Sequence, residues 1–101
     1  MATRSTRDVY EGQRVLIECE FRLLGVPTDP TVVQCTVRSP SGSSTTLNYP
    51  DVNLARRDLG FFEANVTVSE GGTWWFRFEG AGVVDAVQET SLEVLSSNAI
   101  L

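Results

Sequence analysis

Residues 72–82, GTWWFRFEGAG, alternate between two kinds of side chain and begin and end with glycine. Successive side chains of a β-strand point to opposite faces, so one face of this strand is wholly aromatic and the other carries Trp75 and Arg77. The aromatic face consists of Trp74, Phe76 and Phe78. Such a face packs into a core, which restricts the chain to folds with a buried sheet face. Trp75 is then a large aromatic residue on the solvent face, and we take it as the first candidate for a functional residue.

The other candidate strands follow the same period of two. Apolar residues alternate in residues 14–22, 31–38, 61–68 and 83–95, and residues 45–49 form a further short candidate. Turns rich in glycine, proline, serine and aspartate separate these segments. Residues 50–60 are the exception, because they are polar and irregular, with room for one helical turn at most. Six to seven short strands without a convincing helix predict an all-β fold, an antiparallel sandwich of two sheets.

The 101 residues suffice for one domain of this kind, and the two ends fall outside the strand pattern. We expect an N-terminal arm over residues 1–10, the sandwich domain over residues 11–95 and a C-terminal tail over residues 96–101. Arg4 and Arg7 of the arm are candidate contacts with a partner. Such ends either fray or lie on a neighbouring subunit and become ordered there.

The composition argues against several classes of protein. The chain contains no histidine, which removes the usual general base and the commonest metal ligand, and it has no nucleophile motif or dense run of oxygen ligands. We therefore expect no enzyme, no cofactor and no metal site. A net charge of −5 without a basic cluster argues against a nucleic-acid partner. The longest apolar run is too short for a membrane span and the N-terminus lacks the apolar core of a signal peptide, so we expect no membrane partner and no export by that route.

The two cysteines, Cys19 and Cys35, lie on the apolar parity of two different predicted strands. A buried free cysteine behaves as a small apolar residue, and a disulfide has little support in a chain without an export signal. We predict two reduced core thiols and no disulfide.

The solvent faces of the predicted strands carry more apolar residues than a small monomer usually exposes. These residues are Leu16, Val32, Phe61, Trp75 and Val87. A contiguous exposed apolar area usually marks an interaction surface, and tryptophan and arginine are enriched at interface hot spots. We predict a protein interface built from Leu16, Phe61, Trp75, Arg77 and Val87, with Phe61 and Arg77 as neighbours of Trp75. Two alternatives are a cover formed by the 50–60 segment and a pairing of Trp75 with Arg77 inside one subunit.

Two segments resemble an immunoglobulin domain. Residues 11–21, EGQRVLIECEF, are similar to the second strand of that family, with Cys19 in the place of its first cysteine. Gly72, Trp74 and Phe76 stand where the family has a glycine, a tyrosine and its second cysteine. Because Phe76 cannot form a disulfide with Cys19, the resemblance implies an Ig-like sandwich with an all-apolar core.

A narrower resemblance covers residues 10–95. The order and spacing of four short motifs are similar to those of small Ig-like structural proteins encoded among the virion genes of tailed bacteriophages. The motifs are Asp29-Pro30, Pro40 with Gly42, Gly60-Phe61, and residues 72–77. The resemblance implies a subunit of the virion, assembled in the host cytoplasm, that decorates or cements the head by binding the major capsid protein or another virion protein. Self-association into a homo-oligomer and a position in the neck or tail are open alternatives.

A free-standing Ig-like recognition module for a carbohydrate or protein is a second class of function. Such a module binds through loops at one end of the sandwich and is expected to carry aromatic and polar groups in its turns. The turns SPSG, SEGG and EGAG are plain, whereas the aromatic residues lie on a strand face. The pattern therefore favours contact through a sheet face.

Overall fold

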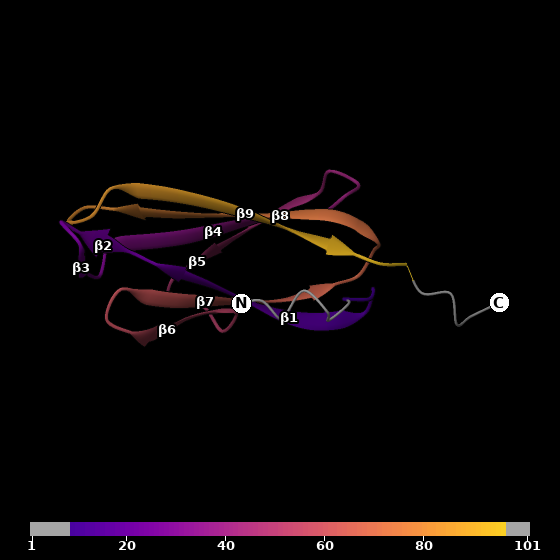
Figure 1. Cartoon of the computed structure of the whole chain (residues 1–101), viewed down its shortest axis with the longest axis horizontal. Helices are drawn as coiled ribbons and strands as arrows, with labels where there is room; N and C mark the ends of the chain where they lie inside the picture. The colour runs from indigo at the N-terminus through magenta and orange to yellow at the C-terminus, as the bar shows by residue number, and fades with distance from the viewer. Residues whose placement is uncertain (1–8, 97–101) are drawn as a thin grey trace.

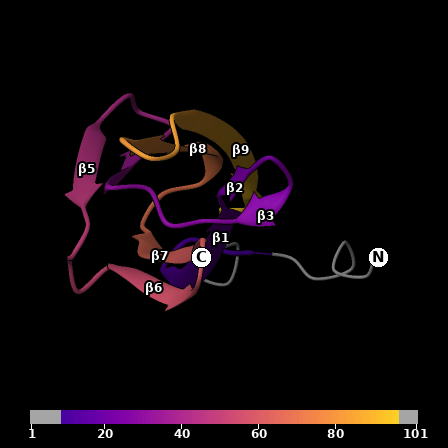
Figure 2. The same cartoon turned by 90° about the vertical axis from the view of Figure 1, so that its left-hand side faces the viewer.

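The structure, a computed structural model, describes residues 9–96 and places them in two antiparallel β-sheets that pack face to face (Figure 1). The first sheet has three strands in the order β1 (Gln13–Glu20), β7 (Phe61–Val68) and β6 (Leu54–Asp58). The second has four strands in the order β5 (Ser44–Asn48), β4 (Val32–Arg38), β8 (Gly72–Ala81) and β9 (Ala86–Val94). A small hairpin joins β2 (Arg22–Leu23) to β3 (Val26–Pro27). The predicted antiparallel sandwich is confirmed, and the end view separates its two layers (Figure 2).

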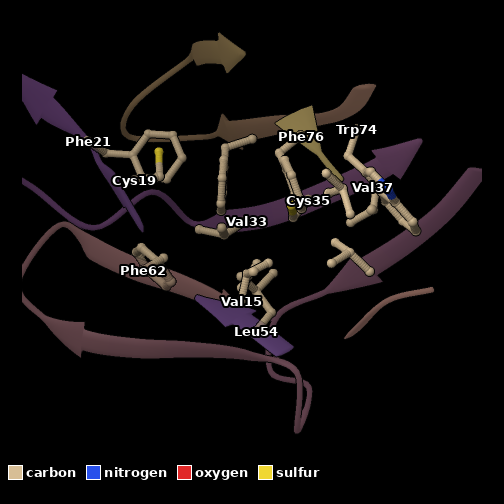
Figure 3. Close-up of a cluster of buried hydrophobic side chains, with 14 of the residues drawn as sticks. Val15, Cys19, Phe21, Val33, Cys35, Val37, Leu54, Phe62, Trp74 and Phe76 are labelled. Atoms are coloured by element: carbon tan, nitrogen blue, oxygen red, sulfur yellow. The ribbon is translucent and has the colours of Figure 1, made fainter. Parts of the chain in front are cut away.

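Apolar side chains from both sheets fill the space between them (Figure 3). Trp74, Phe76 and Phe78 of β8 are buried, as the alternation predicted, and form one cluster with Phe62 of β7 and Val15 of β1. Full burial of a large apolar side chain stabilises a fold by about 1.5–3 kcal/mol. The alternating residues of the two facing sheets therefore supply the main stabilisation of the domain.

The polar segment 50–60 differs from the sequence prediction, because residues Leu54–Asp58 form strand β6 at the edge of the first sheet. The side chain of Leu54 is fully buried, and the strand pairs with β7. Hydrogen bonds to β7 and the buried Leu54 hold this strand, while its last three residues are exposed. An edge strand with so few apolar residues has no periodic signal in the sequence.

Strand β8 also runs further than predicted. Gly80 and Ala81 belong to β8, and β9 begins only at Ala86. Gly80 pairs with Val33 of β4 and Ala86 of β9, and a Cβ atom there would lie 2.7 Å from Cγ of Pro30. This glycine therefore marks a close approach of two segments inside the sandwich, at a position where the sequence predicts a turn.

Asp29 links the loop before β4 to the turn between β6 and β7. Its Oδ1 atom accepts a hydrogen bond from the backbone N–H of Gly60 at 2.7 Å, and Arg56 Nε donates to its Oδ2 at 3.0 Å. These two donors stabilise the carboxylate and hold the pKa of Asp29 below its ordinary value. Two motifs of the resemblance to phage proteins, Asp29-Pro30 and Gly60-Phe61, thus meet in one structural contact.

Cys19 and Cys35 are both free thiols buried in the core, so the predicted absence of a disulfide is confirmed. Burial raises the pKa of each thiol to about 12, and the neighbouring Cys35 and Glu20 add to the effect at Cys19. The reactive thiolate is therefore scarce at neutral pH, and the same burial limits the access of a reagent.

We predict that a thiol reagent at neutral pH reacts with neither cysteine in the native protein and with both after denaturation, without any reductant. The measurement is an absorbance count of released chromophore before and after adding guanidinium chloride. Rapid modification of the native protein would contradict the burial of the thiols. Denatured, unreduced protein that releases no chromophore would instead reveal a disulfide.

Candidate interaction surface

Trp75 lies on the outer face of the second sheet, on a strand that is paired on both sides. In the ladder it stands opposite Arg38 of β4 and Ser91 of β9. Its side chain is 48% exposed, whereas that of the adjacent Trp74 is 5% exposed. The predicted assignment of the two tryptophans to opposite faces is therefore confirmed.

Trp75 lines two open hollows. The first has a volume of about 390 Å³ and is lined by Thr36, Arg38, Ser44, Trp75, Arg77 and Glu89. The second is lined by Arg38, Ser39, Pro40, Thr73 and Trp75. We call the residues that line these two hollows the Trp75 surface. Trp75 and Arg38 line both hollows.

Arg77 and Arg38 differ in how their charges are balanced. Arg77 Nε lies 2.8 Å from Oε2 of Glu79, and its NH1 lies 3.1 Å from Oε2 of Glu89. These carboxylates raise the pKa of Arg77 above its ordinary value. Arg38, by contrast, has no ion pair and no side-chain hydrogen bond within residues 9–96. Among the residues that the structure describes, Arg38 is therefore the guanidinium of this surface that could pair with a partner.

The other predicted interface residues do not gather around Trp75. Phe61 and Leu16 belong to β7 and β1 of the first sheet, so the prediction that Phe61 adjoins Trp75 is wrong. Val87 lies on the same sheet as Trp75 but pairs with Glu79. The ion-paired Arg77 separates it from Trp75, so the expected contiguous apolar area is not formed. Alternation assigns a side chain to a face of its own strand, but it does not reveal which sheet the strand joins.

Two predictions remain. One is that the 50–60 segment covers the exposed apolar residues, and the other is that the N-terminal arm contacts a partner. The 50–60 segment lies at the edge of the first sheet and does not line either hollow, so it does not cover Trp75. Arg4 and Arg7 lie outside the described residues.

No model of a known protein family matches the sequence, and no curated protein matches it. Among solved structures, the crystal structure of the Lin-41 filamin domain is similar, with a TM-score of 0.63 and 20% identity over 87% of this chain and 82% of that chain. The chain has an Ig-like fold of the filamin type. At this identity the likeness concerns the fold alone, and it confirms the Ig-like sandwich predicted from the sequence.

The filamin-type sandwich also exposes apolar residues outside the predicted interface. Leu24 is 95% exposed at the tip of the β2–β3 hairpin, where it has a φ of 52°, and Val26 beside it is exposed. Val83 is exposed in the β8–β9 turn, which lies at the same end of the sandwich (Figure 1). We call these three residues the apolar end. Isolated apolar residues in a short hairpin or a turn follow no periodic sequence pattern. Their exposure is therefore known only from the folded chain.

Two further features of the filamin-type sandwich bear on its chemistry. Within residues 9–96, no group of three or more cysteine, aspartate or glutamate side chains is arranged to hold a metal ion. No helix in that range is long and apolar enough to cross a membrane.

Proposed function

We propose that this chain is a structural protein of a tailed-bacteriophage particle, and specifically a head decoration or cement subunit that binds the capsid lattice through the Trp75 surface. The observation that carries the proposal is the half-exposed Trp75 on the outer sheet face. Tryptophan is among the residue types enriched at interface hot spots. A partner that covers Trp75 would remove its exposed apolar surface from water. The motif order that resembles small Ig-like virion proteins supports the choice of particle.

The position of Trp75 suits repeated docking on a rigid lattice. Strand β8 is paired with β4 on one side and β9 on the other, so the backbone that carries Trp75 is held at both edges. A side chain presented on such a strand loses less conformational freedom on binding than one on a loop. Many identical subunits can then dock in the same orientation with little reorganisation.

The free thiols support assembly in a reducing compartment. Cys19 and Cys35 are both unpaired in the core, and disulfides are rare where glutathione and thioredoxin keep thiols reduced. Assembly of the virion in the host cytoplasm agrees with this chemistry.

We predict that Trp75→Ala leaves a folded, soluble subunit whose affinity for the particle falls about thirtyfold, because truncation of a central aromatic anchor costs about 2 kcal/mol or more of binding. Particles are incubated with increasing amounts of wild-type or variant subunit and sedimented, and the subunit in the pellet is quantified. Circular dichroism and the denaturation midpoint check that the variant is folded.

Leu24→Ser is the matched control, because it removes an exposed apolar side chain from the apolar end and leaves the Trp75 surface intact. We expect it to bind as the wild type does. If Leu24→Ser loses binding and Trp75→Ala keeps it, the apolar end is the docking surface and the Trp75 assignment is wrong. A few copies per particle would favour a neck or tail position, and a wild-type chain that never pellets and instead binds a glycan would replace the virion proposal with a recognition module.

A further inference from the structure

Arg38 is the charged residue of the Trp75 surface that forms no ion pair within residues 9–96. It stands directly opposite Trp75 in the β4–β8 ladder, and its neighbour on the other side is Ser44 of β5. No carboxylate within residues 9–96 pairs with it, although the chain carries a net charge of −5. A free guanidinium beside an exposed indole, on an acidic protein, combines a cationic and an apolar contact in one place.

The charged residues that line the two hollows beside Trp75 differ in whether they have an ion-pair partner. The first is lined by Arg38 and Arg77 against a single carboxylate, Glu89, and the second has Arg38 as its one charged residue. Arg77 is ion-paired with both Glu79 and Glu89, so Arg38 is the charged side chain lining these hollows that has no ion pair within residues 9–96. Charge complementarity therefore calls for a negative group at Arg38.

The side chains around Arg38 fit a carboxylate. A guanidinium has a planar set of N–H donors that bind both oxygens of a carboxylate at once. Thr36 and Ser44 line the same hollow and carry hydroxyl groups that can donate to such an anion. The face of the Trp75 indole offers an adjacent apolar contact, so the complementary group has a carboxylate and an apolar side chain side by side.

We propose that the Trp75 surface recognises a segment of a partner protein in which an aspartate or glutamate lies beside an apolar residue, with Arg38 binding the carboxylate and Trp75 the apolar side chain. This inference rests on the proposed function, since it names the chemistry of the partner at the same surface. Arg38 determines specificity and Trp75 supplies most of the contact area.

The test uses two capped dipeptides that differ in one charge, N-acetyl-Asp-Phe-amide and N-acetyl-Asn-Phe-amide. Each is titrated into the full ¹⁵N-labelled chain, and the indole N–H signal of Trp75 is followed, after assignment by its loss in Trp75→Ala. We expect the aspartate peptide to bind about fivefold more tightly than the asparagine peptide, the ratio that an exposed ion pair supports. The preference should shrink when the salt concentration rises from about 0.05 M to about 0.5 M, because salt screens exposed charges.

Arg38→Gln should abolish the preference for the aspartate peptide, and Arg38→Lys should keep part of it. Arg14→Gln is the matched control, because Arg14 is an exposed arginine of β1 on the other sheet that also has no ion pair within residues 9–96. That variant should keep the full preference. Equal binding of the two peptides, or a preference that survives Arg38→Gln, would overturn the inference, as would an indole signal that moves with maltotriose and with neither peptide.

Particle sedimentation separates this inference from the proposed function. With Arg38→Glu, repulsion of the partner carboxylate should reduce the bound subunit about tenfold or more, while Arg14→Glu should leave it unchanged. If the wild type pellets, Trp75→Ala does not, and Arg38→Glu pellets as the wild type does, the proposed function stands and the inference fails. If the wild type never pellets, the proposed function fails, and the peptide titration decides the chemistry of the surface by itself.

Discussion

Replacing Trp74 with alanine is expected to lower the free energy of unfolding by about 3–5 kcal/mol, which is a large part of the 5–15 kcal/mol typical of a domain. Trp74 is 5% exposed and belongs to the core cluster of β8. Its indole N–H donates to the backbone carbonyl oxygen of Glu70 at 2.9 Å, so truncation also leaves an acceptor without its donor. Urea denaturation followed by circular dichroism gives the difference. Phe76→Ala, at a side chain with no exposed surface, should show a loss of similar size.

Trp75→Ala is the internal control, because it removes the same side chain from the opposite face of the same strand. We expect the isolated protein to lose less than about 1 kcal/mol, as is usual for exposed positions. A greater loss for Trp75→Ala than for Trp74→Ala would reverse the assignment of the two faces and the register of β8 with it.

Replacing Gly60 with alanine is the second change with a large expected effect, about 3 kcal/mol or more of lost stability. A Cβ atom at Gly60 would lie 2.6 Å from the backbone oxygen of Phe21 and 2.8 Å from the backbone nitrogen of Thr28. Both contacts are with backbone, which cannot move aside as a flexible side chain can. Gly60 also has a φ of 76°, a conformation that alanine rarely adopts. Relief of the clash would further weaken the hydrogen bond from its N–H to Asp29.

Gly25→Ala separates the steric part from the conformational part. Gly25 has a φ of 81°, close to that of Gly60, but nothing lies within 4 Å of a Cβ atom built there. We therefore expect this variant to lose only about 1 kcal/mol, the cost of a left-handed conformation in a residue other than glycine. Equal losses for the two variants in urea denaturation would show that crowding at Gly60 contributes nothing.

Most motifs that carry the resemblance to phage proteins lie in contacts that hold the fold. Asp29 binds the backbone of Gly60, and Gly80 and Gly72 leave room for Pro30 and Pro40. A Cβ atom at Gly72 would lie 2.8 Å from Cβ of Pro40. These residues stabilise the fold, whereas the proposed docking depends on Trp75 and Arg38.

The sequence by itself determined the features that follow from the two-residue period of a strand. The burial of Trp74 and Phe76, the exposure of Trp75 and the placement of Cys19 and Cys35 in the core were all predicted and are confirmed. Each follows from alternation along one strand, where the side-chain direction is a local property. The antiparallel sandwich was predicted for the same reason, because several half-apolar strands without a helix must bury their apolar faces against one another.

Only the tertiary structure decided which strands are neighbours, because strand pairing joins residues far apart in the chain. The register of β4 with β8 sets Arg38 beside Trp75, and the assignment of β7 to the other sheet removes Phe61 from that surface. Strand β6 likewise forms because β7 offers it a hydrogen-bonding edge, although its own residues are mostly polar. Alternation along a strand is a local property of the chain, whereas pairing across strands depends on how the whole core is packed.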